Sequence, residues 1–252
     1  DPNFGIQIKT NPIYIQANYL KLARGIPQTH FNCFECHGKG FLKKLGEQCP
    51  ICEGKGEFYS TSIHERLEEI VIPFVGGNDS KFHGQGREDV DTLCFGEGRK
   101  FIIEIKNPKL RTIDLNLLRN NINTRLRKLL IVKDLVLVEK EQIHKIKRAR
   151  ANQKYHHQGI IKLGKFMTFT EFTEHKKKIE DKLTNILITQ RTPLRFITFR
   201  KDQTKKRRIL SINLKFIDQL HLFLAIDVEP GLYLNEFVTG DQYRTSPSLS
   251  NL

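Results

Sequence analysis

The sequence predicts an α+β fold, in which strands and helices follow one another in irregular order. Several short segments alternate apolar and polar residues, which is the pattern of strands with one buried face. Polar capping residues stand directly before amphipathic stretches, where helices commonly begin. Several connections between predicted strands are too short for a parallel crossover, so we expect antiparallel pairs within a mixed sheet.

The first half of the chain contains four predicted strands and two predicted helices. The strands cover residues 4–9, 12–22, 101–106 and 135–138. Ser62 is followed three residues later by Glu65, the spacing of a capping box, and predicts a helix over residues 63–70. Asp114 can cap the second helix. The apolar positions of that helix are Leu115, Leu118, Ile122 and Leu126.

The second half begins with a basic stretch and continues with alternating elements. We expect a polar helix over residues 170–183, strands over 209–217 and 222–228, and a helix over 231–239. Four consecutive basic residues, 205–208, precede the first of these strands. They fit a nuclear signal, a set of phosphate contacts or the tip of a hairpin, and all three interpretations stay open here.

The charge balance indicates a polyanionic partner. The 252 residues include 42 Lys and Arg against 28 Asp and Glu, which gives a formal net charge of +14. Such an excess favours nucleic acid, because each neutralised phosphate releases counterions. A membrane surface is the rival partner, but the sequence has no apolar run of about 18 residues that could span a bilayer.

Four of the five cysteines form two CxxC pairs with twelve residues between the pairs. Each pair opens a CxxCxGxG unit, and two such units can place four thiolates on a tetrahedron around Zn²⁺. Disulfides or four unrelated thiols are the alternatives, but the spacing in a basic protein favours metal and a reducing compartment. The predicted ligands are Cys33, Cys36, Cys49 and Cys52, whereas Cys94 is assigned to a strand core.

Residues 83–91 gather acids, an arginine and two glycines within nine positions. An arginine beside a carboxyl group favours the ionised carboxylate, and glycines allow sharp turns and close approach of a ligand. Taken alone, the segment would be a charged surface turn. Its wider context favours a catalytic site.

That context resembles one enzyme family. FHGQGREDVD at residues 82–91, GEGRKF at 96–101 and EIKNP at 104–108 are similar to the active-site segment of the archaeal/eukaryotic tRNA pseudouridine synthase that acts on the TΨC arm. The resemblance covers residues 12–252 and includes a two-knuckle zinc insert. It implies the pseudouridine synthase fold, a bisected mixed sheet with flanking helices and a small zinc module. It also implies isomerisation of uridine at TΨC-loop positions 55 and/or 54, with no catalytic cofactor.

The resemblance also assigns roles to single residues. Asp89 takes the place of the catalytic carboxylate, and Asp91 is the runner-up, expected on the same side of an extended strand. Tyr155, preceded by Lys154, matches the tyrosine that stacks on the uracil or relays a proton. The family pattern further implies contacts with substrate by five arginines: Arg87, Arg99, Arg191, Arg200 and Arg244.

One position departs from the family pattern. Asn235 stands where the family has a lysine beside the catalytic carboxylate, so another cation must substitute or activity falls. Arg87, Arg99 and Arg244 are the candidates. The alternative function is therefore a catalytically weakened, zinc-containing RNA-binding protein of the same fold. A co-chaperone function would explain only the two CxxCxGxG units and would not account for the excess of basic residues.

The predicted organisation has three parts. Residues 1–30 supply strands that lead into the catalytic domain, 31–58 form the zinc module, and 59–252 form the catalytic domain. In the family an N-terminal RNA-binding accessory domain precedes this segment. We expect tRNA as the partner, structural Zn²⁺, no membrane association, and location in the nucleus and/or cytoplasm.

Overall fold

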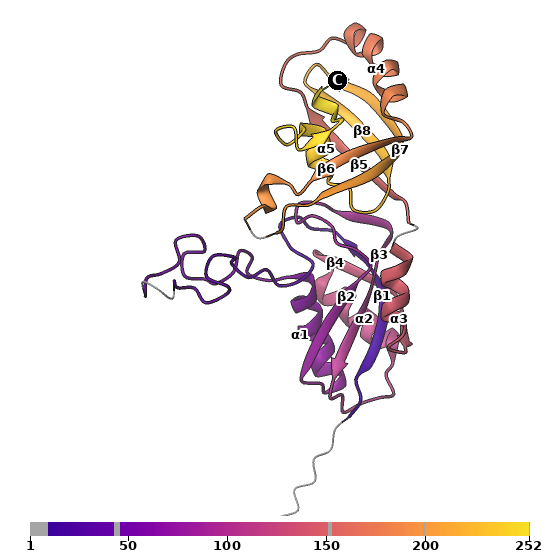
Figure 1. Ribbon diagram of the computed structural model, residues 1–252. Coiled ribbons are helices and arrows are strands. Elements are labelled where there is room, and N and C mark those ends of the chain that lie inside the picture. Colours follow the sequence, from indigo (N-terminus) through magenta and orange to yellow (C-terminus); the bar gives the residue numbers. More distant parts are fainter. Residues whose placement is uncertain (1–9, 43–45, 151–152, 199, 252) are drawn as a thin grey trace, which may run out of the picture. The chain divides into compact units, whose positions relative to one another are not determined.

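The computed structural model describes residues 10–42, 46–150, 153–198 and 200–251 (Figure 1). The chain divides into two compact units, residues 1–149 and 150–252. The predicted strand over residues 4–9 lies outside the described residues. None of the described helices is both long enough and apolar enough to cross a membrane.

The first unit is built on a four-stranded antiparallel sheet with the order β2-β3-β1-β4. Its strands are β1 (Ile13–Lys21), β2 (Asp79–Gly84), β3 (Cys94–Lys106) and β4 (Leu130–Val138). Helices α1 (Ile63–Val75) and α2 (Leu115–Leu126) pack on one face, against alternate β1 residues such as Ile15 and Ala17. Helix α3 (Gln142–Ala149) packs Ile143 and Ile146 on the other face, so the sheet is buried between helices on both sides.

The capping signals in this unit predict the helix starts correctly. The Ser62 hydroxyl accepts a hydrogen bond from the Glu65 N–H at 3.2 Å, and the Asp114 carboxylate accepts one from the Leu117 N–H at 2.9 Å. α1 runs past the expected end at residue 70 because Val71 and Val75 also face the core. It ends at Gly76, whose left-handed φ of 66° suits glycine.

Two strands of the first unit, β3 and β4, are longer than the sequence pattern indicated, and so is β7 of the second unit, which begins at Thr204 rather than at residue 209. β3 begins at Cys94 rather than at residue 101, and β4 begins at Leu130 rather than at residue 135. In β4 the alternation is interrupted by a bulge at Asp134, where φ is 58° and the register with β1 shifts. The Asp134 carboxylate accepts a hydrogen bond from Asn18 at 2.9 Å, so a polar pair occupies the bulge.

The second unit is a five-stranded antiparallel sheet with the order β5-β8-β7-β6-β9. Its strands are β5 (Tyr155–Lys162), β6 (Ile186–Arg191), β7 (Thr204–Asp218), β8 (His221–Val228) and β9 (Thr245–Ser246). Helix α4 (Phe169–Leu183) covers one face, and its Thr168–Glu171 capping box is complete. The short helices are η2 (Leu194–Phe196), α5 (Leu234–Thr239) and η3 (Leu249–Asn251).

These elements confirm the α+β class. Where the sequence predicts a mixed sheet in two parts, every strand pair within the described ranges is antiparallel, and each unit holds one sheet. The shortest connection, residues 219–220 between β7 and β8, has a length that only an antiparallel hairpin allows. The basic run 205–208 is paired with β6 inside β7, so its interpretation as a hairpin tip is wrong.

Candidate functional site

Residues 83–91 form the end of β2 and the loop that leads into β3. β2 ends at Gly84, and the Gln85 N–H still donates to the Lys100 carbonyl at 2.9 Å. The backbone then turns, because the Thr92 N–H donates to the Asp89 carbonyl at 3.1 Å. The expectation that Asp89 and Asp91 share one side of an extended strand is therefore wrong.

Glu88 supplies the buried carboxylate of this loop. Its side chain is 1% exposed, and its Oε2 lies 2.7 Å from Nε of Arg99 in an ion pair. The Tyr19 hydroxyl donates to Glu88 Oε1 at 2.6 Å and accepts from the Gln28 amide at 2.8 Å. Burial and the adjacent carboxylate raise the pKa of Tyr19 well above its ordinary value, so the phenol keeps its proton and donates. This network fixes the chain one residue before Asp89.

A buried lysine fixes the chain on the other side of the same residue. The Lys21 ammonium donates to the Val90 carbonyl at 2.8 Å and to the Asp89 carbonyl at 3.3 Å. The Gly25 N–H also donates to the Val90 carbonyl, at 3.0 Å. Our reading of the sequence missed Lys21. Its signal was available, because it follows Tyr19 on the inward-facing side of β1, where lysine is rarely found.

The charged side chains of the loop differ in their exposure to solvent. Asp89 is partly exposed, Asp91 is exposed, and Arg87 is exposed with its Nη2 donating to Thr29 Oγ1 at 2.6 Å. Arg99, by contrast, is 11% exposed. The first unit thus gathers three of the predicted site residues, Arg87, Asp89 and Arg99. A carboxylate with solvent access on a firmly held backbone suits nucleophilic or acid–base chemistry.

The other predicted catalytic and substrate-binding residues lie in the second unit. Tyr155 is the first residue of β5, packs against the core of that unit, and donates its hydroxyl hydrogen to Gln153 Oε1 at 3.2 Å. Lys154, directly before it, is exposed. The tyrosine therefore faces the core of the unit, and the lysine before the strand is open to solvent.

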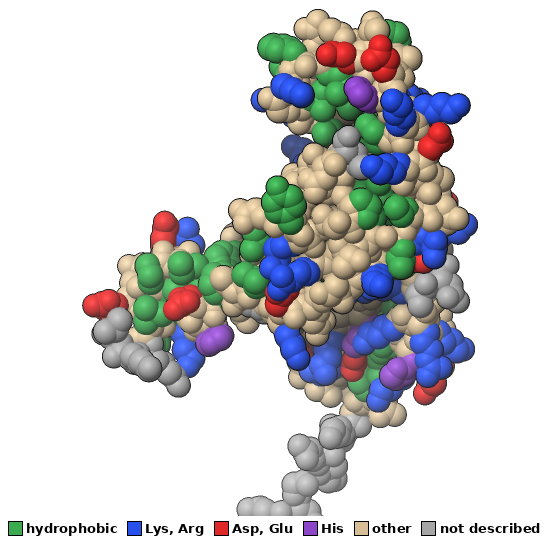
Figure 2. All heavy atoms as spheres, turned by 45° about the horizontal axis from the view of Figure 1, so that its top comes forward, with side chains coloured by type: hydrophobic (Ala, Val, Ile, Leu, Met, Phe, Trp, Pro, Cys, Tyr) green, Lys and Arg blue, Asp and Glu red, His purple; other side chains and the backbone are tan. Residues whose placement is uncertain are grey.

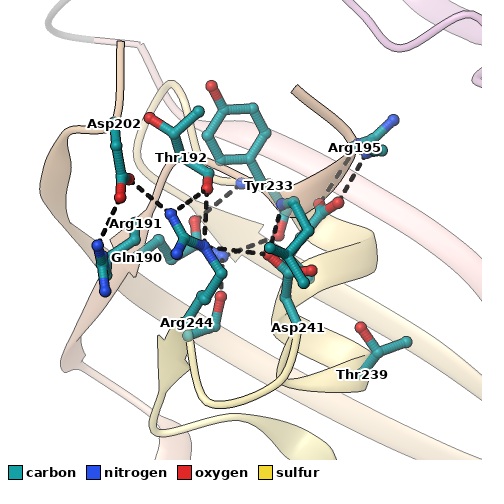
Figure 3. A network of polar contacts seen from close by, with 12 residues as sticks. Gln190, Arg191, Thr192, Arg195, Asp202, Tyr233, Thr239, Asp241 and Arg244 are labelled. Atoms are coloured by element: carbon teal, nitrogen blue, oxygen red, sulfur yellow. Dashed lines mark hydrogen bonds and ion pairs between the residues drawn. The ribbon is translucent and has the colours of Figure 1, made fainter. Parts of the chain in front are cut away.

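Asp202 joins two of the predicted arginines (Figure 3). Its carboxylate accepts from Arg244 Nη2 at 2.6 Å and from Arg191 Nη2 at 2.5 Å. Arg244 also donates to the Thr192 carbonyl through Nε and Nη2. Hydrogen bonds from Arg244 and then Arg191 hold the pKa of Asp202 below its usual range, although burial opposes them. Arg244 is 11% exposed and Arg191 52%, so Arg191 keeps an accessible guanidinium.

Arg200 contacts two aromatic residues of the same unit. Its guanidinium lies 4.5 Å from the Phe196 ring centroid, and its Nη1 donates to the Tyr233 hydroxyl at 3.4 Å. Two hydrogen bonds of 2.9 Å join the side-chain amide of Gln190 to the backbone of Tyr233. The Q-R-T-P and G-x-Y motifs, far apart in sequence, are therefore held together in space.

Asn235, the departure from the family pattern, lies on α5 and is exposed. The next residue, Glu236, is buried and pairs with Arg195 at 2.7 Å. α5 is thus anchored through Glu236, while position 235 faces away from the core.

The four predicted metal ligands come together. The sulfurs of Cys33, Cys36, Cys49 and Cys52 all lie within 4.8 Å of one another, and all four residues are buried. The Cys33–Cys49 and Cys36–Cys52 sulfur distances are 3.9 and 3.7 Å. Tetrahedral zinc with bonds of about 2.3 Å requires about 3.8 Å between sulfurs, so the cluster fits such an ion. Cys94 lies outside it, at the start of β3.

The two knuckles support each other reciprocally. The Cys33 N–H donates to the Gly56 carbonyl at 2.7 Å, and the Cys49 N–H donates to the Gly40 carbonyl at 2.8 Å. The Gly40 and Gly56 amides in turn donate to the sulfurs of Cys36 and Cys52 at 3.2 Å. A side chain at Gly56 would place Cβ 2.6 Å from the Gly38 carbonyl oxygen, so glycine is required there. Burial acts to raise the pKa of Cys36, but the Gly40 amide and neighbouring thiols outweigh it and lower the pKa to about 7.

His30 connects the base of this module to α1. Its Nδ1 lies 2.8 Å from Glu65 Oε1 and 3.7 Å from Glu57 Oε2, and its Nε2 lies 2.8 Å from Asn32 Oδ1. Burial acts to lower the pKa of His30, but hydrogen bonds to Glu65 and Asn32 raise it above 6.5.

We expect this connection to weaken as the pH rises. A histidine with a raised pKa stabilises the folded arrangement fully below its unfolded pKa, and the contribution disappears as the pH passes the folded value, above 6.5. Hydrogen exchange at the Asn32–Glu57 bridge in zinc-loaded protein should therefore accelerate as the pH rises above 6.5, beyond the intrinsic pH effect. His30→Gln should abolish that excess, and an unchanged excess in this variant would contradict the assignment.

The chain matches the sequence profile described as "Pus10, C-terminal" over residues 14–252. It is 40% identical to the tRNA pseudouridine synthase Pus10 of Methanothermobacter marburgensis over 98% of this chain and 58% of that protein. The proteins of the same name from Methanosphaera stadtmanae and Methanocaldococcus jannaschii are 36% and 34% identical, over 99% and 98% of this chain and 58% and 51% of their own lengths. The chain thus spans between half and three-fifths of these curated relatives.

Proposed function

The chain belongs to the Pus10 family, and we propose that it is the catalytic part of a tRNA pseudouridine synthase. The family match carries this proposal because it extends over both units. The sequence motifs indicated the same family. The relatives' shared name supplies the reaction, the isomerisation of uridine to pseudouridine in tRNA.

The finer proposal is that the target lies in the TΨC loop, at position 55 and/or 54. The resemblance of residues 82–108 to the active-site segment of the synthases that act on this arm supports it. The net charge of +14 is consistent with a partner that exposes phosphates on every side.

The reaction exchanges one glycosidic bond for another. The N1–C1′ bond breaks, the base turns, and a C5–C1′ bond forms; C5 loses a proton and N1 gains one, so the reaction is balanced without an oxidant or reductant. Asp89 is proposed as the nucleophile. Its support is the motif position, its partial exposure, the side-chain contact of Glu88 before it and the backbone contact of Val90 after it.

We propose different roles for the exposed and the buried residues among the remaining predicted site residues. Arg87, Lys154 and Arg191 are exposed and suited to phosphate contacts, and the guanidinium of Arg200 lies over the Phe196 ring. Arg99 and Arg244 are mostly buried in ion pairs, so they act through the loops that they hold. Tyr155 is proposed to stack on the uracil or to relay the C5 proton. The four cysteines are proposed to hold structural Zn²⁺.

Asn235 favours a second candidate, an RNA-binding protein of the same fold with weakened catalysis. One measurement distinguishes the two candidate functions. Full-length protein is incubated with an unmodified tRNA transcript, and pseudouridine is mapped at each uridine. Product at position 55 or 54 supports the synthase, and a transcript with cytidine at both positions is the control. Tight binding without product under any condition would favour the second candidate.

We expect tRNA affinity to fall steeply with salt. Lys and Arg predominate over Asp and Glu on the face drawn in Figure 2. If about six phosphates are neutralised, the affinity should fall about a thousandfold between 50 and 200 mM salt. Reversing the charges of Lys205 and Lys206 should weaken binding of all RNAs about equally and lower the salt slope by about two. A filter-binding titration at several salt concentrations measures this, and a flat salt dependence would contradict it.

A further inference from the structure

Lys21 occupies a position where the fold expects an apolar residue. β1 alternates, and its inward-facing residues before Lys21 include Ile15, Ala17 and Tyr19. Lys21 continues this row and is fully buried. Removing an ammonium ion from water is costly, and an aliphatic side chain would fill the same space without that cost. Packing alone therefore does not explain the lysine.

The contacts of the ammonium show what it does. Among the described residues, no carboxylate forms an ion pair with Lys21, and its hydrogen bonds go to the backbone carbonyls of Asp89 and Val90. Burial lowers the pKa of Lys21, while the carboxylates of Glu88 and Asp91 act in the opposite direction. The carboxylates of the loop thus stabilise the positive charge of Lys21, while its hydrogen bonds go to the carbonyl groups of Asp89 and Val90.

The peptide groups on either side of Asp89 determine where its side chain points. The peptide before Asp89 is fixed by Glu88, whose carboxylate is bound by Arg99 and Tyr19. The Asp89 and Val90 carbonyls are fixed by Lys21. With both flanking peptides held, the Cα–Cβ direction of Asp89 is set by the first unit.

The arginines suggested by the sequence as the compensating cation have other partners. Arg99 is neutralised by Glu88, and Arg244 is paired with Asp202 in the second unit. Arg87 is exposed, with a hydrogen bond to Thr29. The Lys21 ammonium contacts the backbone of Asp89 itself.

We propose that Lys21 is a positioning residue for Asp89, whose buried ammonium fixes the loop and thereby aims the carboxylate at the substrate. The proposal rests on the proposed pseudouridine synthase activity. Lys21 acts through the backbone and does not touch the reacting atoms.

Lys21→Met in the full-length protein tests the proposal. The methionine fills the space but donates no hydrogen bond. We expect kcat for pseudouridine formation to fall about 10- to 100-fold, the size of effect that a misplacement near 1 Å produces. KM and the tRNA Kd should stay within about threefold, because affinity comes mainly from phosphate contacts. Lys81→Met is the matched control. It removes the same charge from an exposed position on β2 of the same sheet and should leave kcat unchanged.

Two further measurements separate positioning from simple stabilisation. The amides of residues 89–92 should exchange about tenfold faster in Lys21→Met, while those in the middle of β1 keep their rates. Lys21→Gln retains a donor for one carbonyl, so its kcat should lie between those of Lys21→Met and the wild type. It also decides the question if the methionine variant does not fold. A kcat within threefold of wild type, or a loss that disappears when the variant is assayed well below its Tm, would overturn the proposal.

The activity itself is checked in the same experiment. If the wild type forms no pseudouridine, the proposed function fails. The exchange rates of residues 89–92 then still decide whether Lys21 fixes the loop.

Discussion

Asp89→Asn should abolish pseudouridine formation while leaving tRNA affinity within a few fold. The amide is almost the same size as the carboxylate, so the loop contacts of Glu88 and Lys21 remain and the fold is preserved. The amide lacks the negative charge that a nucleophile or base requires. Affinity should hardly change, because phosphate contacts dominate it. Single-turnover kinetics and a binding titration on the same preparation measure both quantities.

Asp91→Asn is the matched control for this variant. Asp91 lies two residues later in the same turn and is more exposed, so we expect a measurable rate to remain. An active Asp89→Asn with an inactive Asp91→Asn would move the catalytic assignment by two residues. Full activity in both would remove this loop from the catalytic site.

Removing the metal should unfold the zinc module and spare the two sheets. Among the described residues of the module, Leu42 is the one partly buried apolar side chain that packs against the four cysteines. Such a segment has too little apolar surface to fold alone, and structural zinc contributes on the order of 10 kcal/mol. We expect one equivalent of zinc per chain, and Cys49→Ser should lose it together with hydrogen-exchange protection over residues 31–58.

Cys94→Ser is the matched control, because Cys94 lies at the start of β3 and outside the cluster. This variant should keep one equivalent of zinc and the protection of the module. Protein purified without chelator that contains no zinc by elemental analysis would contradict the assignment. Collapse of the first sheet in Cys49→Ser would show that the module also supports the catalytic unit.

Local signals in the sequence were sufficient to predict the starts of α1 and α2 and the cluster of four cysteines. Ser62 and Asp114 act on backbone amides two or three residues away, so their effect is readable without knowing the rest of the fold. The CxxCxGxG spacing is local in the same sense, since each knuckle bonds its own glycine amide. The family motifs likewise identified the Asp89 segment.

Features that depend on distant partners were not readable in this way. α1 extends to Val75 because it packs against the sheet, and β4 passes through the bulge at Asp134 because Asn18 pairs with it. The turn after Asp89 could not be distinguished from a continuing strand, since both suit a short polar segment.

The sequence by itself determined the class of fold, the starts of α1 and α2, the cluster of four cysteines and the family. Only the tertiary structure decided that Glu88 is the buried acid, that Arg244 is occupied by Asp202, and that Lys21 holds the Asp89 loop. The physical reason is sequence separation. Lys21 and Val90 are 69 positions apart and meet only because β1 lies beside β3 in the sheet, so their hydrogen bond exists only once the sheet has formed.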